Sequence, residues 1–257
     1  NLYVADSENH AIRQIAISSG GVEVSTLAGS ARKHGSADGT GAAAKFYKPY
    51  GITSDGPNLY VADSFNHTIR QIVISSGEVS TLAGSGSPGY QDAQGISASF
   101  KRPHGLTVDF DGNVFVADKG NHLIRKIDKN GNVSTYAGTN NVARSDDGQG
   151  VEATFNSPWS IDIDFVGNLY VAEFGSNLIR KIDVSGNVNT LAGTSGMAGS
   201  NDGTGDLANF NQPTGIAVDA SGIVYLADFG NHLIRKLSVV GDTVNFRVSF
   251  ADAAGNS

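Results

Sequence analysis

One fifteen-residue phrase recurs through the chain at a nearly fixed interval. The segment NLYVADSENHAIRQI begins at Asn1 and NLYVADSFNHTIRQI begins at Asn58, so thirteen of the fifteen positions are identical. Related segments begin at Asn113, Asn168 and Ile223, which gives steps of 57, 55, 55 and 55 residues. A fixed period of this length is typical of proteins that stack one structural unit several times. The repeat therefore limits the possible folds more than any other feature of the sequence.

Each repeat contains short apolar segments that we interpret as strands. In the second repeat they read GITSD, LYVAD, IRQI and VSTLAG, and turn-forming residues separate them. Runs of four to six such residues bounded by Gly, Asp and Asn predict strands, and apolar residues at consecutive positions indicate burial on both faces of a sheet. Four-stranded antiparallel sheets stacked face to face form a β-propeller. We therefore expect an all-β propeller with five visible blades, either complete or part of a six-bladed ring.

The repeated phrases resemble those of the NHL-repeat family. The resemblance rests on YVAD, the Asn-His dipeptide, IRK, TLAG and the F-x-x-P-x-G segment that precedes each later repeat. The fourth repeat departs from it, with Ser176-Asn177 in place of the dipeptide. The resemblance implies a propeller, usually of six blades, over residues 1–240. We expect residues 241–257 to supply a closing strand and the start of a linker or a further module.

The first repeat lacks the segment that should form the inner strand, because Asn1 opens directly on the second strand. The run TVNFRVSF should form the outer strand of the fifth blade, with Val244, Phe246, Val248 and Phe250 on one face. We expect the first blade to be completed from outside these 257 residues. Exposed strand edges attract other strands, so donation by a neighbouring copy would make the protein a polymer-forming module.

Charged residues that recur in every repeat are expected to serve the architecture, because an active site needs its groups only once. The recurring acids are Asp6, Asp63, Asp118, Glu173 and Asp228, and the recurring arginines are Arg13, Arg70, Arg125, Arg180 and Arg235. We expect the carboxylates to accept hydrogen bonds from turn amides. We expect the apolar core to be filled by Phe46, Phe100, Phe155 and Phe210.

Residues that differ between repeats are the candidates for ligand binding. Variation on a rigid scaffold is typical of a binding surface, and residues flanking the Pro of each inner strand should lie near one mouth of the propeller channel. The fourth repeat also departs from the others at Asp162 and Glu173. Drift in a tolerant repeat is the alternative explanation for these differences. The predicted ligand-binding residues are Lys48, Tyr50, Arg102, His104, Trp159, Asp162, Glu173 and Thr214.

The sequence predicts no metal centre and no cofactor. The Asp-Gly loops contain Asp38, Asp92, Asp146, Asp147 and Asp202. Calcium in these loops is a weak alternative, because none has the alternating Asp-x-Asp-x-Asp pattern. We expect these aspartates to cap the short GAAAKF turn instead. Only two of the six histidines, His34 and His104, lie outside the recurring dipeptide, too few for a three-histidine zinc site.

Composition restricts the classes of partner. The net charge is −7, with 25 acidic and 18 basic residues, which argues against nucleic acid and against an RNA-binding propeller. No apolar run approaches the length of about 18 residues that a membrane span needs. The low charged fraction of 17 per cent and the abundant Gly favour an extracellular or cell-surface location, and Asn132 lies in a possible glycosylation sequence.

We therefore expect a non-catalytic binding or assembly scaffold within a larger extracellular protein. Its partner would be a protein, a glycan or neighbouring copies of itself. The alternative is a propeller enzyme of the lyase or lactonase type with its site at the channel mouth, and the sequence does not decide whether the chain is an enzyme.

Overall fold

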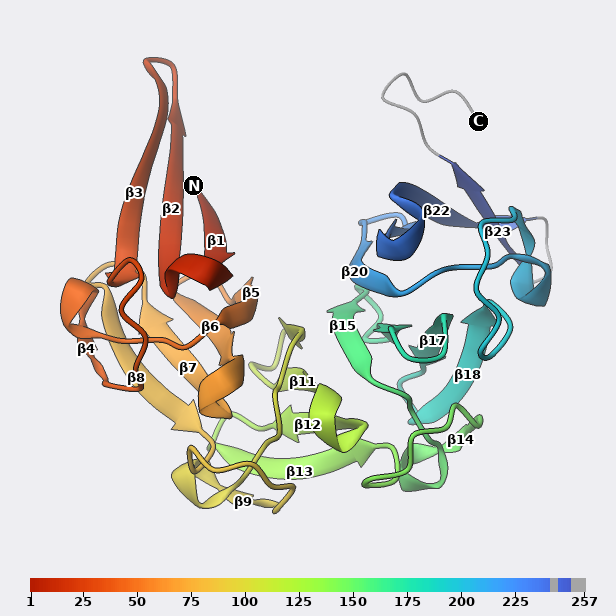
Figure 1. Ribbon diagram of the computed structural model, residues 1–257, viewed down its shortest axis with the longest axis horizontal. Coiled ribbons are helices and arrows are strands. Elements are labelled where there is room, and N and C mark those ends of the chain that lie inside the picture. The colour runs from red at the N-terminus through yellow and green to blue at the C-terminus, as the bar shows by residue number, and fades with distance from the viewer. Residues whose placement is uncertain (241–244, 251–257) are drawn as a thin grey trace. The chain divides into compact units, whose positions relative to one another are not determined.

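The computed structural model describes residues 1–240 and 245–250, and its strands form five antiparallel sheets (Figure 1). This confirms the predicted all-β class and the five propeller blades. The chain divides into two compact units. The first contains Asn1–Gly120 and Arg125–Ser134, and the second contains Asn121–Ile124 and Thr135–Ser257. The described part of the chain contains no helix with the length and apolar character of a membrane span.

The first three blades follow the order of the repeats. The first is a three-stranded sheet of β1 (Leu2–Asp6), β2 (Ala11–Ser18) and β3 (Gly21–Gly29). The second contains, in spatial order, β5 (Pro49–Ser54), β6 (Asn58–Asp63), β7 (Thr68–Val73), β8 (Glu78–Ala83) and β4 (Gly39–Thr40). The third contains β10 (Leu106–Val108), β11 (Val114–Asp118), β12 (Leu123–Ile127), β13 (Asn132–Ala137) and β9 (Ala93–Gln94). The missing inner strand of the first blade is therefore confirmed.

The last two blades repeat the same order. The fourth contains β15 (Pro158–Ile163), β16 (Leu169–Glu173), β17 (Leu178–Ile182), β18 (Asn187–Ala192) and β14 (Gly148–Gln149). The fifth contains β20 (Pro213–Val218), β21 (Val224–Asp228), β22 (Leu233–Val240), β23 (Asn245–Phe250) and β19 (Gly203–Thr204). Strand β23 pairs with β22, as predicted for the outer edge of this blade. Val244 and the tail 251–257 lie outside the described residues, and the predicted boundary at residue 240 stays a prediction.

Blades two to five each have one strand more than the four predicted. The additional strand is only two residues long and pairs with the outermost long strand, as Gly39 pairs with Val79 and Thr40 with Glu78. It leads into a single 3-10 turn. These turns are η2 (Gly41–Ala43), η4 (Gly95–Ser97), η6 (Gly150–Glu152) and η7 (Gly205–Leu207). The predicted aspartate cap is wrong, because no side chain caps η2, η4, η6 or η7.

A second set of 3-10 turns follows the second long strand of most repeats. These turns are η1 (Ser7–Asn9), η3 (Ser64–Asn66), η5 (Lys119–Asn121) and η8 (Phe229–Asn231). The histidine of the dipeptide follows each turn in the left-handed conformation, with φ near +60°. In the fourth repeat residues 174–177 form a hydrogen-bonded turn instead, and the N–H of Asn177 donates to the carbonyl oxygen of Glu173.

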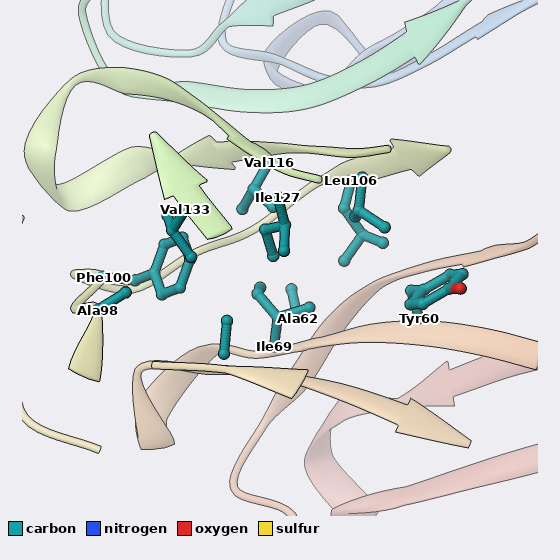
Figure 2. Close-up of a cluster of buried hydrophobic side chains, with 11 residues drawn as sticks. Tyr60, Ala62, Ile69, Ala98, Phe100, Leu106, Val116, Ile127 and Val133 are labelled. Carbon is teal, nitrogen blue, oxygen red and sulfur yellow. The ribbon is translucent and has the colours of Figure 1, made fainter. Parts of the chain in front are cut away.

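The core lies between neighbouring sheets, because the strands are buried on both faces. Figure 2 shows the cluster between the second and third blades, where Ile69 and Phe100 meet Val116, Ile127 and Val133. Matching clusters join the first blade to the second and the fourth to the fifth. The predicted role of the recurring phenylalanines is confirmed, since all four are fully buried. Burial of one such ring stabilises a core by roughly 1.5–3 kcal/mol.

Candidate functional site

The recurring arginine of each complete blade is buried between two carboxylates. In the second blade, Arg70 Nη1 donates to Asp63 Oδ2 at 2.8 Å and to the carbonyl oxygen of Lys45 at 2.9 Å. Its Nη2 donates to Asp38 Oδ1 at 2.6 Å and to the carbonyl oxygen of Ala37 at 3.1 Å. The side chains of Arg70 and Asp63 are fully buried, whereas that of Asp38 is 50 per cent exposed. This network explains the recurring acid and the recurring arginine together.

The same network recurs in the other complete blades, and each guanidinium lies 5.1–5.3 Å from the ring of the recurring phenylalanine. The paired groups are Arg125 with Asp118 and Asp92, Arg180 with Glu173 and Asp147, and Arg235 with Asp228 and Asp202. All five loop aspartates considered as calcium ligands pair with an arginine, since Asp146 pairs with Arg144. Among the residues that the structure describes, no group of three His, Asp or Glu side chains is placed to hold a metal ion.

Turn amides also bind the recurring acids, as predicted. The N–H of Tyr47 donates to Asp63 Oδ1 at 2.7 Å, and Asn66 Nδ2 donates to Asp63 Oδ2 at 2.7 Å. Burial raises the pKa of Asp63 to about 6, while these two donors and Arg70 act in the opposite direction. In the incomplete first blade, Arg13 lies 3.6 Å from Asp6 and its side chain is 31 per cent exposed.

The histidine of the dipeptide links one blade to the next. His67 Nδ1 accepts a hydrogen bond from the N–H of Arg102 at 3.0 Å, 35 residues further along the chain. His10 and His122 make the same bond to the N–H groups of Lys48 and Ser157. In the fourth blade Asn177 Oδ1 takes this role and accepts from the N–H of Gln212 at 2.8 Å. We name this contact the interblade hydrogen bond.

The structure brings four predicted ligand-binding residues of the first unit together. The rings of Tyr50 and His104 stack with their centroids 4.3 Å apart. Lys48 Nζ and the Arg102 guanidinium lie 5.6 and 5.1 Å from the centroid of Phe65. We name Lys48, Tyr50, Phe65, Arg102 and His104 the cationic aromatic patch.

Electrostatics in this patch favour a neutral histidine beside fixed cations. Burial and the charges of Lys119 and Arg102 lower the pKa of His104 to about 3. Burial and Arg102 also lower the pKa of Lys119. Lys48 pairs with Glu8 at 2.9 Å, and this hydrogen bond raises the pKa of Lys48. Sequence reasoning missed Phe65 and Lys119, which lie one and two residues before the asparagine of the Asn-His dipeptide in their repeats.

The predicted residues of the second unit have more varied surroundings. Trp159 is half-buried and stacks on Phe174 with ring centroids 4.6 Å apart. Asp162 Oδ2 accepts a hydrogen bond from the N–H of Val218 at 2.8 Å, which links β15 to β20. Thr214 lies half-buried on β20. The side chains of Glu173 and Arg180 are both fully buried, so a ligand would contact the residues around Glu173 and not its carboxylate. The ligand-binding roles of these residues stay predictions.

A polar pocket of about 320 Å³ lies beside Glu173 in the second unit. Its walls include Arg144, Ser145, Asp146, Asn156 and Ser176. Sequence reasoning noted Glu173 and Ser176 as departures from the repeat but missed Arg144. Counting back eleven residues from each recurring phenylalanine gives Gly35, Gly89 and Gly199 in the other repeats and Arg144 in this one. That spacing would have revealed the third departure.

Two segments, residues 100–127 and 210–237, match the model of the NHL repeat. Each runs from the buried phenylalanine through the recurring acid and the dipeptide to the third long strand. These two segments of the chain are therefore similar to the NHL repeat. Residues of this chain are 38 per cent identical to those of Protein SUPPRESSOR OF QUENCHING 1, chloroplastic, of Arabidopsis thaliana, over half of this chain and 13 per cent of that protein. They are also 38 per cent identical to NHL repeat-containing protein 2 of Gallus gallus, over 49 per cent of this chain and 19 per cent of that one.

The similarity to the curated relatives thus covers less than a fifth of their own length. Among solved structures, a streptogramin B lyase superposes with a TM-score of 0.54. That similarity covers 80 per cent of this chain and 56 per cent of the lyase, at 15 per cent sequence identity. At this identity the similarity concerns the fold alone.

Proposed function

We propose that the chain is a non-catalytic binding module whose cationic aromatic patch binds an acidic partner. The observation that carries this proposal is the grouping of Lys48, Arg102 and Lys119 around aromatic rings in a chain with a net charge of −7. A local cluster of cations on a protein of opposite net charge favours specific rather than general attraction of anions. Aromatic side chains add contact area at little cost in conformational entropy.

Two probes separate the kinds of acidic partner. Heparin represents an acidic glycan and poly-glutamate represents an acidic protein segment, and binding of each is measured by calorimetry at low and moderate salt. We expect Lys48→Ala/Arg102→Ala to weaken binding at least tenfold and to reduce its salt dependence. Lys129→Ala, an exposed lysine on a hairpin turn, serves as the matched control. The proposal fails if neither probe binds, or if both variants behave alike.

A lyase or lactonase remains the alternative, because His104 is a buried neutral imidazole next to Tyr50. Hydrolysis of a model lactone that disappears in His104→Gln, with the fold intact by circular dichroism, would support the enzyme. A chain that binds heparin or poly-glutamate and shows no such hydrolysis would support the binding module.

Assembly through the first blade is the second part of the proposal. This blade has three strands, and the β1 side chains of Leu2 and Val4 are 56 and 41 per cent exposed. Val22 and Val24 on β3 are exposed as well. Exposed apolar strands at a sheet edge favour pairing with another strand. Sedimentation velocity tests this: we expect assembly that depends on concentration and that Val4→Lys prevents, and a strict monomer at all concentrations would contradict the proposal.

We also propose an extracellular location, on the basis of the low charged fraction and the abundant Gly, and fractionation of the native protein would test it.

A further inference from the structure

One position of the repeat is filled by a side-chain amide in the second and fifth blades. Asn66 Nδ2 donates to Asp63 Oδ2 at 2.7 Å and to the carbonyl oxygen of Gly35 at 2.6 Å. Asn231 Nδ2 makes the equivalent bonds to Asp228 Oδ2 at 2.8 Å and to the carbonyl oxygen of Gly199 at 2.7 Å. The asparagine therefore fills the space between the end of the second long strand and the loop before the inner strand.

Three substitutions change this position in the fourth blade. Ser176 replaces the asparagine, Glu173 replaces the aspartate and Arg144 replaces the loop glycine. The longer Glu173 side chain receives Ser176 Oγ and Ser145 Oγ, each at 2.6 Å from Oε2. The amide that bridges strand and loop elsewhere is thus gone, and the pocket of about 320 Å³ lies at this place. Two of the three changed residues, Arg144 and Ser176, line this pocket, and the third, Glu173, holds the hydroxyl group of Ser176.

The chemistry of the pocket walls indicates a neutral ligand. The Arg144 and Asp146 side chains pair at 3.2 Å, and the Glu173 carboxylate is paired with Arg180, so the charges cancel. Because Ser145 and Ser176 both donate their hydroxyl protons to Glu173, their oxygens can accept from a ligand. The Arg144 guanidinium and the Asn156 side chain can donate. Mixed donors and acceptors without net charge match a molecule that carries several hydroxyl groups.

We propose that this pocket binds a single neutral sugar residue. Its volume lies at the lower end of the range of about 300–1,000 Å³ for small-molecule sites, which suits one hydroxylated ring. The buried Glu173 acts as a positioning residue, because it fixes the direction in which the two serine hydroxyls donate. The site belongs to the second unit and uses none of the residues of the cationic aromatic patch, so the two proposals stand or fall separately.

The test uses the whole chain and a panel of glucose, galactose, mannose and N-acetylglucosamine, with glucuronate as the charged comparison. Each sugar is titrated to about 50 mM while backbone amide resonances are followed by NMR, a range that detects a Kd of about 1–10 mM. We expect saturable shifts at the amides of Ser145, Ser176 and Gly196 with at least one neutral sugar.

The decisive variant restores the residues that the second and fifth blades have at these positions. Glu173→Asp/Ser176→Asn should fold normally, because the same pair is present in the second and fifth blades, and it should weaken sugar binding at least tenfold. Ser185→Asn, on a hairpin turn of the same blade, is the control and should bind as the parent chain does. The proposal is overturned if no neutral sugar shifts these amides, if glucuronate binds more tightly, or if the double variant retains binding.

Discussion

Removing one carboxylate from a buried arginine network should cost more stability than removing a surface ion pair. Asp63→Ala would leave the fully buried Arg70 with Asp38 alone, and it would also remove the acceptor of Tyr47 N–H and Asn66 Nδ2. Breaking a buried pair by removing one partner typically destabilises a protein by about 3–5 kcal/mol. The loss of one hydrogen-bond acceptor, which is all that the sequence suggested, would cost only about 1–3 kcal/mol.

Urea denaturation followed by far-UV circular dichroism measures this cost, and the fluorescence of Trp159 reports separately on the second unit. Asp38→Ala is the control, because its carboxylate is 50 per cent exposed and its loss would leave Arg70 paired with the buried Asp63, so it should cost less stability. Asp63→Ala/Arg70→Met, which removes both charges, should recover part of the loss. An equal loss of unfolding free energy in Asp63→Ala and Asp38→Ala would refute the argument that the buried Asp63–Arg70 pair contributes most of the stability of this network.

The remaining predictions concern the histidine of the interblade hydrogen bond and a glycine that packs against it. Burial and Arg102 lower the pKa of His67 in the folded chain, so unfolding takes up a proton below about pH 6.5. The contribution of neutral His67 to stability is therefore present above that pH and is lost as the pH falls. His67→Asn, which copies the natural Asn177, should reduce this loss of stability in urea titrations between pH 7 and 5. Gly84→Ala should destabilise by about 1–3 kcal/mol, because φ is +104° and a Cβ would lie 2.6 Å from the carbonyl oxygen of His67. Gly112→Ala, at φ +82° in open space, should cost less in the same thermal melts, and an equal cost would contradict the proposed clash.

Local sequence features predicted the blades well because each strand is marked within a few residues. These marks are the turn residues, the consecutive apolar positions and the recurring phenylalanine, and all of them act over short distances. The structure confirms the strands that they predicted and the burial of the phenylalanine rings. The two-residue strands escaped prediction because Gly39 and Thr40 carry no strand signal; only the β8 backbone beside them makes a strand there.

Long-range contacts were predicted less well, for a physical reason. Asp38 is a plausible turn cap when only its neighbours are considered, but its partner Arg70 lies 32 residues away. The acceptor role of His67 likewise depends on Arg102, 35 residues further on. Only part of the polar pocket could be identified from the sequence. Glu173 and Ser176 differ clearly from the equivalent residues of the other repeats, whereas Arg144 lies in a loop whose sequence varies between repeats.

The span of these contacts has a consequence for how such a chain can grow. The arginine network closes within one blade, so a duplicated segment that contains a whole blade carries its own countercharges and inserts no unpaired ion into the core. The interblade hydrogen bond instead joins each copy to the next, because a copy placed after another supplies a backbone N–H for the histidine of the copy before it. Gene duplication can therefore lengthen the array without compensating mutations. The fourth blade has changed residues in both connections and has kept both, because Glu173 still pairs with Arg180 and Asn177 still accepts from the N–H of Gln212.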